Sequence, residues 1–129
     1  MTTVDVDCSL SIGGSSSVPG SFTHFLGYSC NANLPNAALS SRLYKDPSGG
    51  FNFGLVSEAA ENVSGPSASI DGTFSPYTPA SYKQIGTAVL DAPPANATTS
   101  YKFVKNDFCR PINFGLQAQC GVSYKFDNL

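Results

Sequence analysis

The chain has no tryptophan, one methionine and one histidine, and only 12% of its 129 residues are charged. Globular domains usually carry about 25% charged residues, so hydroxyl and amide groups must form most of this surface. Seven basic residues stand against nine acidic ones, which gives a net charge of −2. A nucleic-acid-binding surface needs clustered Lys and Arg to neutralise phosphates. Nucleic acid is therefore excluded as an expected partner.

Long apolar runs are also missing. No stretch approaches the roughly 20 apolar residues that a membrane-spanning helix needs, so no membrane span is expected. The residues after Met1 lack the basic start and apolar run of a signal peptide. We therefore expect either that a signal was removed or that the protein leaves its cell by another route. The length predicts a single domain covering residues 1–129.

The most regular feature present is a repeated Tyr-Lys step, which includes four of the five lysines: Tyr44-Lys45, Tyr82-Lys83, Tyr101-Lys102 and Tyr124-Lys125. Neighbouring side chains on a strand point to opposite faces, so each step predicts a ring in the core and an ammonium group in water. The alternative is that the four tyrosines are ligand or interface aromatics on one exposed face. We favour core packing, because large aromatic side chains are usually buried.

Short apolar or aromatic runs alternate with Gly, Pro, Asn and Ser clusters along the chain. This pattern predicts strands at residues 4–12, 21–34, 39–45, 51–56, 67–74, 81–90, 99–109 and 112–126. Residues 13–20, 46–50 and 91–98 are predicted loops. Only residues 55–63 have helix-forming composition, and the breaker pair Gly65-Pro66 follows them. The expected fold is an all-β antiparallel sandwich, Ig-like or jelly-roll, with about seven to nine strands.

The four cysteines are Cys8, Cys30, Cys109 and Cys120. An even number in a small Ser- and Gly-rich chain predicts two disulfides and an oxidising, extracellular or virion location, although four buried thiols are the alternative. The spacings match no zinc template. Three pairings are possible, and we favour Cys8–Cys30 and Cys109–Cys120, because each pair flanks a predicted strand–turn–strand.

Candidate chemical groups are few. His24 is the only histidine, and it has no flanking acid and no nucleophile-elbow motif, so a structural role is preferred over a general base or metal ligand. Asp5 and Asp7 lie on one face of the first predicted strand, but no calcium-loop motif accompanies them. A solvated polar face accounts for the pair. We expect no catalytic residue, no metal and no cofactor.

These observations predict a non-enzymatic structural subunit of an extracellular or virion assembly: a coat, decoration or filament protein that self-associates. Low charge leaves association unopposed by repulsion. The alternative is a secreted binding module that recognises glycan or protein through loops or an exposed aromatic face. The expected partners are further copies of the chain or neighbouring assembly subunits, with a glycan or another protein as the alternative.

Overall fold

The computed structural model of the protein describes residues 4–17, 20–46, 54–74, 80–90, 99–112 and 116–126, the side chains at 4, 16, 17, 46, 80, 99–101, 125 and 126 excepted. Seven strands account for most of this part of the chain. They are β1 (Val4–Ser17), β2 (Ser21–Asp46), β3 (Gly54–Phe74), β4 (Ala80–Leu90), β5 (Thr99–Phe103), β6 (Cys109–Ile112) and β7 (Gln117–Phe126). The expected all-β class and the strand number are confirmed.

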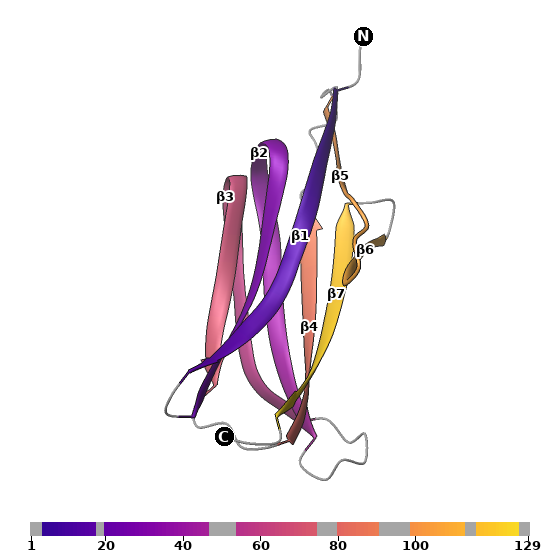
Figure 1. Cartoon of the computed structure of the whole chain (residues 1–129). Coiled ribbons are helices and arrows are strands. Elements are labelled where there is room, and N and C mark those ends of the chain that lie inside the picture. The colour runs from indigo at the N-terminus through magenta and orange to yellow at the C-terminus, as the bar shows by residue number, and fades with distance from the viewer. Residues whose placement is uncertain are drawn as a thin grey trace.

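All seven strands belong to one sheet in the order β5-β1-β2-β4-β7-β6, with β3 paired to β2 outside this path. β1 and β5 are parallel, and the other described pairs are antiparallel. The segment after β5 bridges β1 and β7: Val104 N donates to Cys8 O at 2.7 Å, and Gly121 N donates to Phe108 O at 3.1 Å. The sheet is therefore nearly closed, like a barrel (Figure 1). The finer expectation of an Ig-like or jelly-roll sandwich is not confirmed.

The strand β2 bends back on itself. His24 and Ser41 lie 17 residues apart in β2, yet their side chains are 2.7 Å apart. The same number of residues would span about 56 Å in a straight strand. The bend falls between residues 30 and 37, where the register of β2 with β3 shifts twice. Figure 1 shows this curve at the top of β2.

The bend divides the sheet into two halves that face each other. The first half contains β1, β5, residues 21–30 of β2 and residues 67–74 of β3. The second half contains residues 37–46 of β2, residues 54–63 of β3, β4, β6 and β7. Between the arms of β3, Gly65 has a φ of 106°, which side chains other than glycine rarely tolerate. The breaker pair Gly65-Pro66 thus marks the point at which the paired strands β2 and β3 pass from one half of the sheet to the other.

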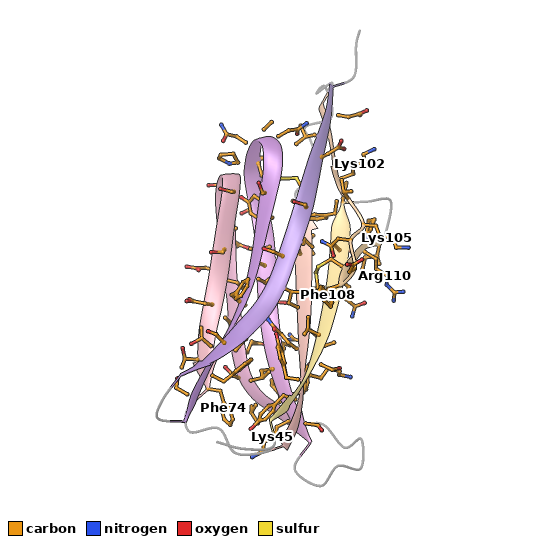
Figure 2. All side chains as sticks on the ribbon, viewed as in Figure 1. Lys45, Phe74, Lys102, Lys105, Phe108 and Arg110 are labelled. Atoms are coloured by element: carbon orange, nitrogen blue, oxygen red, sulfur yellow. A yellow bond between two sulfur atoms is a disulfide. The ribbon has the colours of Figure 1, made fainter. Side chains whose placement is uncertain are left out.

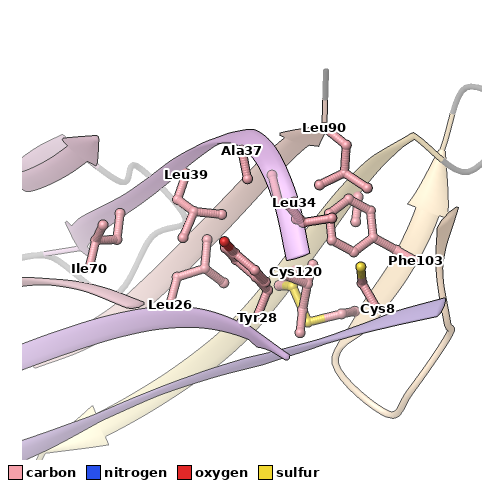
Figure 3. Packing of buried hydrophobic residues seen from close by; sticks show 14 of the residues in the cluster. Cys8, Leu26, Tyr28, Leu34, Ala37, Leu39, Ile70, Leu90, Phe103 and Cys120 are labelled. Atoms are coloured by element: carbon pink, nitrogen blue, oxygen red, sulfur yellow. A yellow bond between two sulfur atoms is a disulfide. The ribbon is translucent and has the colours of Figure 1, made fainter. Parts of the chain in front are cut away.

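The core lies between the two halves. Apolar side chains from both halves fill it, and Figure 3 shows Leu26, Leu34, Leu39, Leu90 and Phe103 converging. A second buried cluster contains Phe22, Leu43 and Tyr82. Burial of this kind is the main favourable term in folding and holds the halves together.

Both favoured disulfides are confirmed. Cys8–Cys30 joins β1 to β2 in the first half, and Cys109–Cys120 joins β6 to β7 in the second half. In each case the two cysteines are register partners on adjacent antiparallel strands. All four cysteines are bonded.

Several predicted boundaries change in the structure. The strand predicted at 81–90 is confirmed as β4, but those predicted at 21–34 and 39–45 are two arms of β2. The predicted loop 13–20 is wrong for residues 13–17, which belong to β1. The Phe25 ring lies 2.9 Å from the point where a Cβ on Gly13 would sit, so this glycine makes room for an aromatic ring within the strand. The predicted loops 46–50 and 91–98 lie almost entirely outside the described residues.

Residues 55–63, the one segment with helix-forming composition, form no helix. These residues belong to β3, where register partners in residues 37–44 of β2 run alongside them. Helix propensities differ by only a few tenths of a kcal/mol per residue, so pairing and burial override them. Two of the other predicted strands overlap β3: 51–56 at its start and 67–74 at its end. The strand predicted at 99–109 corresponds to β5, which ends earlier, at Phe103. The strand predicted at 112–126 contains the end of β6 and all of β7.

Candidate functional site

A buried polar chain connects the two halves through the single histidine. His24 Nδ1 lies 2.7 Å from Ser41 Oγ, and His24 Nε2 lies 2.8 Å from Ser57 Oγ. Gln84 Nε2 donates both to Ser41 Oγ at 2.9 Å and to Phe25 O at 3.0 Å. These contacts satisfy both ring nitrogens of His24, so the polar chain is stable without water.

The Gln84 side chain is also satisfied at its oxygen, because the Tyr124 hydroxyl donates to Gln84 Oε1 at 2.6 Å. Burial raises the pKa of Tyr124 to about 12, which keeps the hydroxyl protonated as the donor. The ring of Tyr124 meets Phe22 edge-on, with centroids 5.1 Å apart. The network thus fixes which side chains of the two halves lie opposite one another.

Burial lowers the pKa of His24 below 6.5, and the negative charge of Asp71 opposes this shift. A neutral ring suits the network, because one ring nitrogen donates and the other accepts. A catalytic base needs an approach route for substrate, whereas His24 and Ser41 are both 0% exposed. The geometry fits a structural histidine that fixes the register between the halves.

The four tyrosines of the Tyr-Lys steps do not form one exposed row in the described part of the chain. Tyr82 is 1% exposed and lies in the smaller core cluster, while Lys83 is partly exposed. Tyr124 packs partly buried against the same cluster. Tyr44 and Lys45 are both partly buried, and the side chain of Tyr101 lies outside the described residues. The expected pattern of a buried ring followed by a more exposed lysine therefore holds for Tyr82 and Lys83. Tyr44 and Lys45 do not differ in this way.

The carboxylates of β1 face solvent. Asp5 and Asp7 are exposed, and Asp7 Oδ1 lies 3.7 Å from Lys102 Nζ of the parallel neighbour β5. Among the described residues, no cluster of three or more His, Cys, Asp or Glu side chains could hold a metal ion. Asp7 is placed for a weak surface ion pair, of the kind that contributes at most about 1 kcal/mol.

Among the residues that the structure describes, the most exposed large apolar side chain lies on the loop between β5 and β6. Phe108 is 57% exposed and Val104 is 47% exposed. The loop lines an open hollow of about 380 Å³ that also includes Lys105, Arg110 and Ile85. Figure 2 shows Phe108, Lys105 and Arg110 grouped beside β6 and β7. The sequence does not predict this feature, because the strand predicted at residues 99–109 includes the segment.

A second hollow of about 460 Å³ lies over β2, β3 and β4. Small side chains line it: Ala38, Ser40, Ala60 and Thr87, together with Asn62 and Val89. Leu39 and Glu61, which are register partners, also border the hollow, but the Leu39 side chain lies in the core. Val89 is 38% exposed. Methyl, hydroxyl and amide groups therefore share this depression.

The outer edge of β3 is the third feature. In the part of the chain that the structure describes, β3 pairs only with β2. Its 21 residues alternate between exposed and partly buried for most of their length, and only Ile70 is fully buried. Alternate backbone groups on such an edge point away from the sheet and can pair with another strand.

No protein-family model matches the chain, and no curated protein matches it either. No helix in the described residues is long and apolar enough to cross a membrane. The candidate sites therefore stand on their own geometry.

Proposed function

We propose that the protein is a non-enzymatic structural subunit of an extracellular or virion assembly, such as a coat, decoration or filament. The observation that carries this proposal is the long outer edge of β3, which pairs only with β2 among the described strands. A second copy adds a strand to this edge, so main-chain hydrogen bonds give affinity. The net charge of −2 leaves little repulsion between copies.

Two further features support the proposal. Two disulfides suit an oxidising compartment outside the reducing cytosol. The facing halves support a description of the fold as a flattened β-sandwich, Ig-like or jelly-roll, which exposes both outer faces to neighbours. Sandwich subunits of this kind associate through their faces and edges.

Light scattering over a wide concentration range tests the self-association directly. We expect oligomers or filaments at concentrations of about 10 μM and above, in line with ordinary interface affinities. A monodisperse monomer at millimolar concentration would contradict the proposal.

Hydrogen exchange tests the edge itself. In the assembly, alternate amides of β3 should exchange more slowly than in the dilute monomer, because the added strand protects them. The central strand β4 is the control, since it already has β2 and β7 on its two sides. Equal protection of β3 in both states would remove the edge from the assembly contact.

The alternative function is a secreted module that binds a glycan or a protein. The exposed Phe108 between Lys105 and Arg110 favours it, because aromatic rings stack on sugar rings and cations attract acidic groups. Titration with acidic oligosaccharides, followed by the NMR signals of Phe108, tests this function. Unchanged spectra at millimolar ligand would exclude it.

A further inference from the structure

The buried polar chain around His24 separates the two apolar clusters of the core. On the first arm of β2, the fully buried side chains of Phe22, His24 and Leu26 follow at intervals of two positions, so all three point inward. On β4, Gln84 follows Tyr82 at the same interval. Phe22 and Tyr82 belong to the smaller cluster, whereas Leu26 belongs to the larger one. The polar side chains between the clusters form a layer across the core, here named the polar layer: His24, Ser41, Ser57 and Gln84.

The two ends of the molecule on either side of the polar layer differ in strength. Both disulfides belong to the larger cluster (Figure 3). The smaller cluster contains three fully buried side chains, with three partly buried ones packed against them: Val56, Phe74 and Tyr124. Figure 2 shows Phe74 at the lower end of the molecule, opposite the bend of β2. An end with few buried contacts and no covalent bond opens at a lower free energy than the rest of the fold.

The hydrogen bonds of the polar layer have a defined direction. Gln84 Nε2 donates to the carbonyl oxygen of Phe25, which can only accept, so the orientation of the Gln84 amide is fixed. Its second N–H goes to Ser41 Oγ. Gln84 and His24 are the only hydrogen-bond partners of the Ser41 side chain among the described residues, so the Ser41 hydroxyl donates to His24 Nδ1. The ring proton of His24 is therefore on Nε2, from which it is donated to Ser57 Oγ.

A proton on His24 Nδ1 is incompatible with this direction. Nδ1 would then donate, and Ser41 Oγ would face two donors, His24 and Gln84. The hydroxyl hydrogen of Ser41 would be left without an acceptor in the described part of the core. An unpaired buried donor and a buried charge are both unfavourable, whereas water satisfies both groups once the end is open. Protons therefore bind the open form more tightly than the closed form.

Few other titratable groups act on His24. Burial lowers the pKa of His24, and the negative charge of Asp71 on β3 opposes this shift. Tyr124 of β7 stays protonated, because burial raises its pKa to about 12. β1 places Gly14 beside His24. Tyr82 of β4 packs in the smaller cluster. The other charged side chains next to the polar layer along β2, β3 and β4 lie on outward-facing positions: Arg42, Glu58 and Lys83.

We propose that the polar layer is a proton-operated latch: with Nδ1 unprotonated, His24 keeps the end that contains the smaller cluster closed, and protonation opens this end while the disulfide-bonded end stays folded. Opening exposes the apolar side chains of Phe22, Leu43 and Tyr82. All contacts of the latch lie within one chain, so it does not depend on the proposed self-assembly. Phe74 belongs to β3, so opening also releases part of the β3 edge. Acid should therefore loosen an assembly built on that edge, and this consequence alone rests on the proposed function.

NMR of the dilute full-length chain tests the state of the ring. His24 is the only histidine, so its imidazole signals need no separate assignment. At pH 7.5 we expect a neutral ring with the proton on Nε2, which the nitrogen and carbon chemical shifts report. The titration midpoint should lie below 6.5. A proton on Nδ1 at pH 7.5, or a midpoint at or above 6.5, would overturn the latch.

Hydrogen exchange of the same monomer tests where the chain opens. Between pH 7.5 and 5.5, the protection factors of amides around Leu43 and Tyr82 should fall several-fold, up to about ten-fold. This limit applies because a group with a pKa of 6.5 that titrates only in the open form changes the opening equilibrium by that factor. Amides around Leu39 and Ala88, in the larger cluster, are the control and should keep their protection. An equal loss at both ends, or no loss near Leu43 and Tyr82, would contradict a local opening.

Two variants separate the latch from a general effect of acid. His24→Gln keeps a donor and an acceptor but does not titrate, so its protection factors near Leu43 should be the same at both pH values. A response equal to that of the wild type would assign the opening to other groups. Asp71→Asn should move the midpoint of His24 to a still lower pH, because it removes the opposing charge. Asp5→Asn, an exposed carboxylate on β1, is the matched control and should leave the midpoint unchanged. Equal midpoints in the two variants would contradict the surroundings of His24 from which the latch is inferred.

The outcomes separate the latch from the proposed function. If the wild type assembles but its smaller-cluster end keeps its protection at pH 5.5, the latch is wrong and the proposed function stands. If the wild type stays monomeric at millimolar concentration and this end opens in acid, the proposed function is wrong and the latch stands.

Discussion

The outer faces of the two halves differ, although the same two strands, β2 and β3, run through both. Residues Ser9, Ser11, Ser29, Ser67 and Ser69 line the outer face of the first half. On the second half, alanines at 38 and 60 take the corresponding kind of position, and Val89 and the Phe108 loop stand beside them. One ribbon thus presents a hydroxyl face on one side and a methyl-lined face on the other.

The difference bears on the proposed association of this weakly charged protein. Hydroxyl groups keep their water, because a partner without matching donors and acceptors would leave them unsatisfied. Methyl groups around a hollow lose nothing when they are covered. Because only 12% of the residues are charged, we expect the balance of serine and alanine on each face to influence association.

The largest expected effect concerns the contact between the halves, beneath both faces. His24→Ala should lower the free energy of unfolding by about 4 kcal/mol, because it leaves a cavity and removes the partner of Ser57. Urea denaturation measures it. Ser29→Ala on the hydroxyl face is the control and should change stability by less than about 0.5 kcal/mol. Equal effects of the two changes would show that the network does not join the halves.

The second-largest effect on stability is expected from the disulfides, one of which lies in each half. Cys109→Ala/Cys120→Ala and Cys8→Ala/Cys30→Ala should each cost roughly 3 kcal/mol, because each bond closes a loop of 11 or 22 residues. Only the first pair should also change the surroundings of Phe108, since that disulfide borders the Phe108 loop. Urea denaturation measures the stability, and the NMR signals of Phe108 report on the loop. A matching change at Phe108 in both variants would erase the distinction.

Acidification should lower the free energy of unfolding by a smaller amount, through the network that connects the halves. The pKa of His24 is lowered in the folded protein from its usual 6.5, so the unfolded chain binds a proton first as the pH falls. The stability is therefore complete above about pH 6.5 and declines below it, down to the lower folded pKa. Urea midpoints at pH 7.5 and 5.5 measure the change. His24→Gln should show a smaller difference between these two values, and an identical difference would assign the decline to other groups.

The smallest effect is expected on the hydroxyl face. Ser11→Ala and Ser69→Ala should each shift stability by less than about 0.5 kcal/mol, because both side chains are exposed. Together they should raise the tendency to associate, since they make this face resemble the other one. Static light scattering measures the change, and unchanged scattering would show that hydroxyl groups alone do not keep the face free.

Regular alternation and register partners could be predicted from the sequence. The start of β1 follows a period-2 pattern, and both disulfides join cysteines that flank a predicted strand–turn–strand. The position of Gly13 within a strand could not be predicted, because this glycine makes room for the Phe25 ring of a neighbouring strand. The same holds for residues 55–63, whose pairing with β2 outweighs local helix propensity.

The candidate sites were harder to predict, because each one depends on distant segments meeting. Nothing next to His24 in the sequence indicates Ser41, Ser57 or Gln84 as neighbours. The hollow beside Glu61 combines residues from three strands. The segment Val104–Phe108 falls within the strand predicted at 99–109, although its sequence, VKNDF, has three consecutive polar residues and no strand alternation.

The parallel pairing of β1 with β5 sets the order in which the chain can fold. Val4 is the register partner of Thr99, so one edge of β1 cannot pair until the chain has been made as far as β5. The other edge can pair early with β2 through the short connection between Ser17 and Ser21. Contacts so distant in sequence slow folding. We expect slow, chaperone-sensitive maturation, with the second edge of β1 unpaired until β5 arrives.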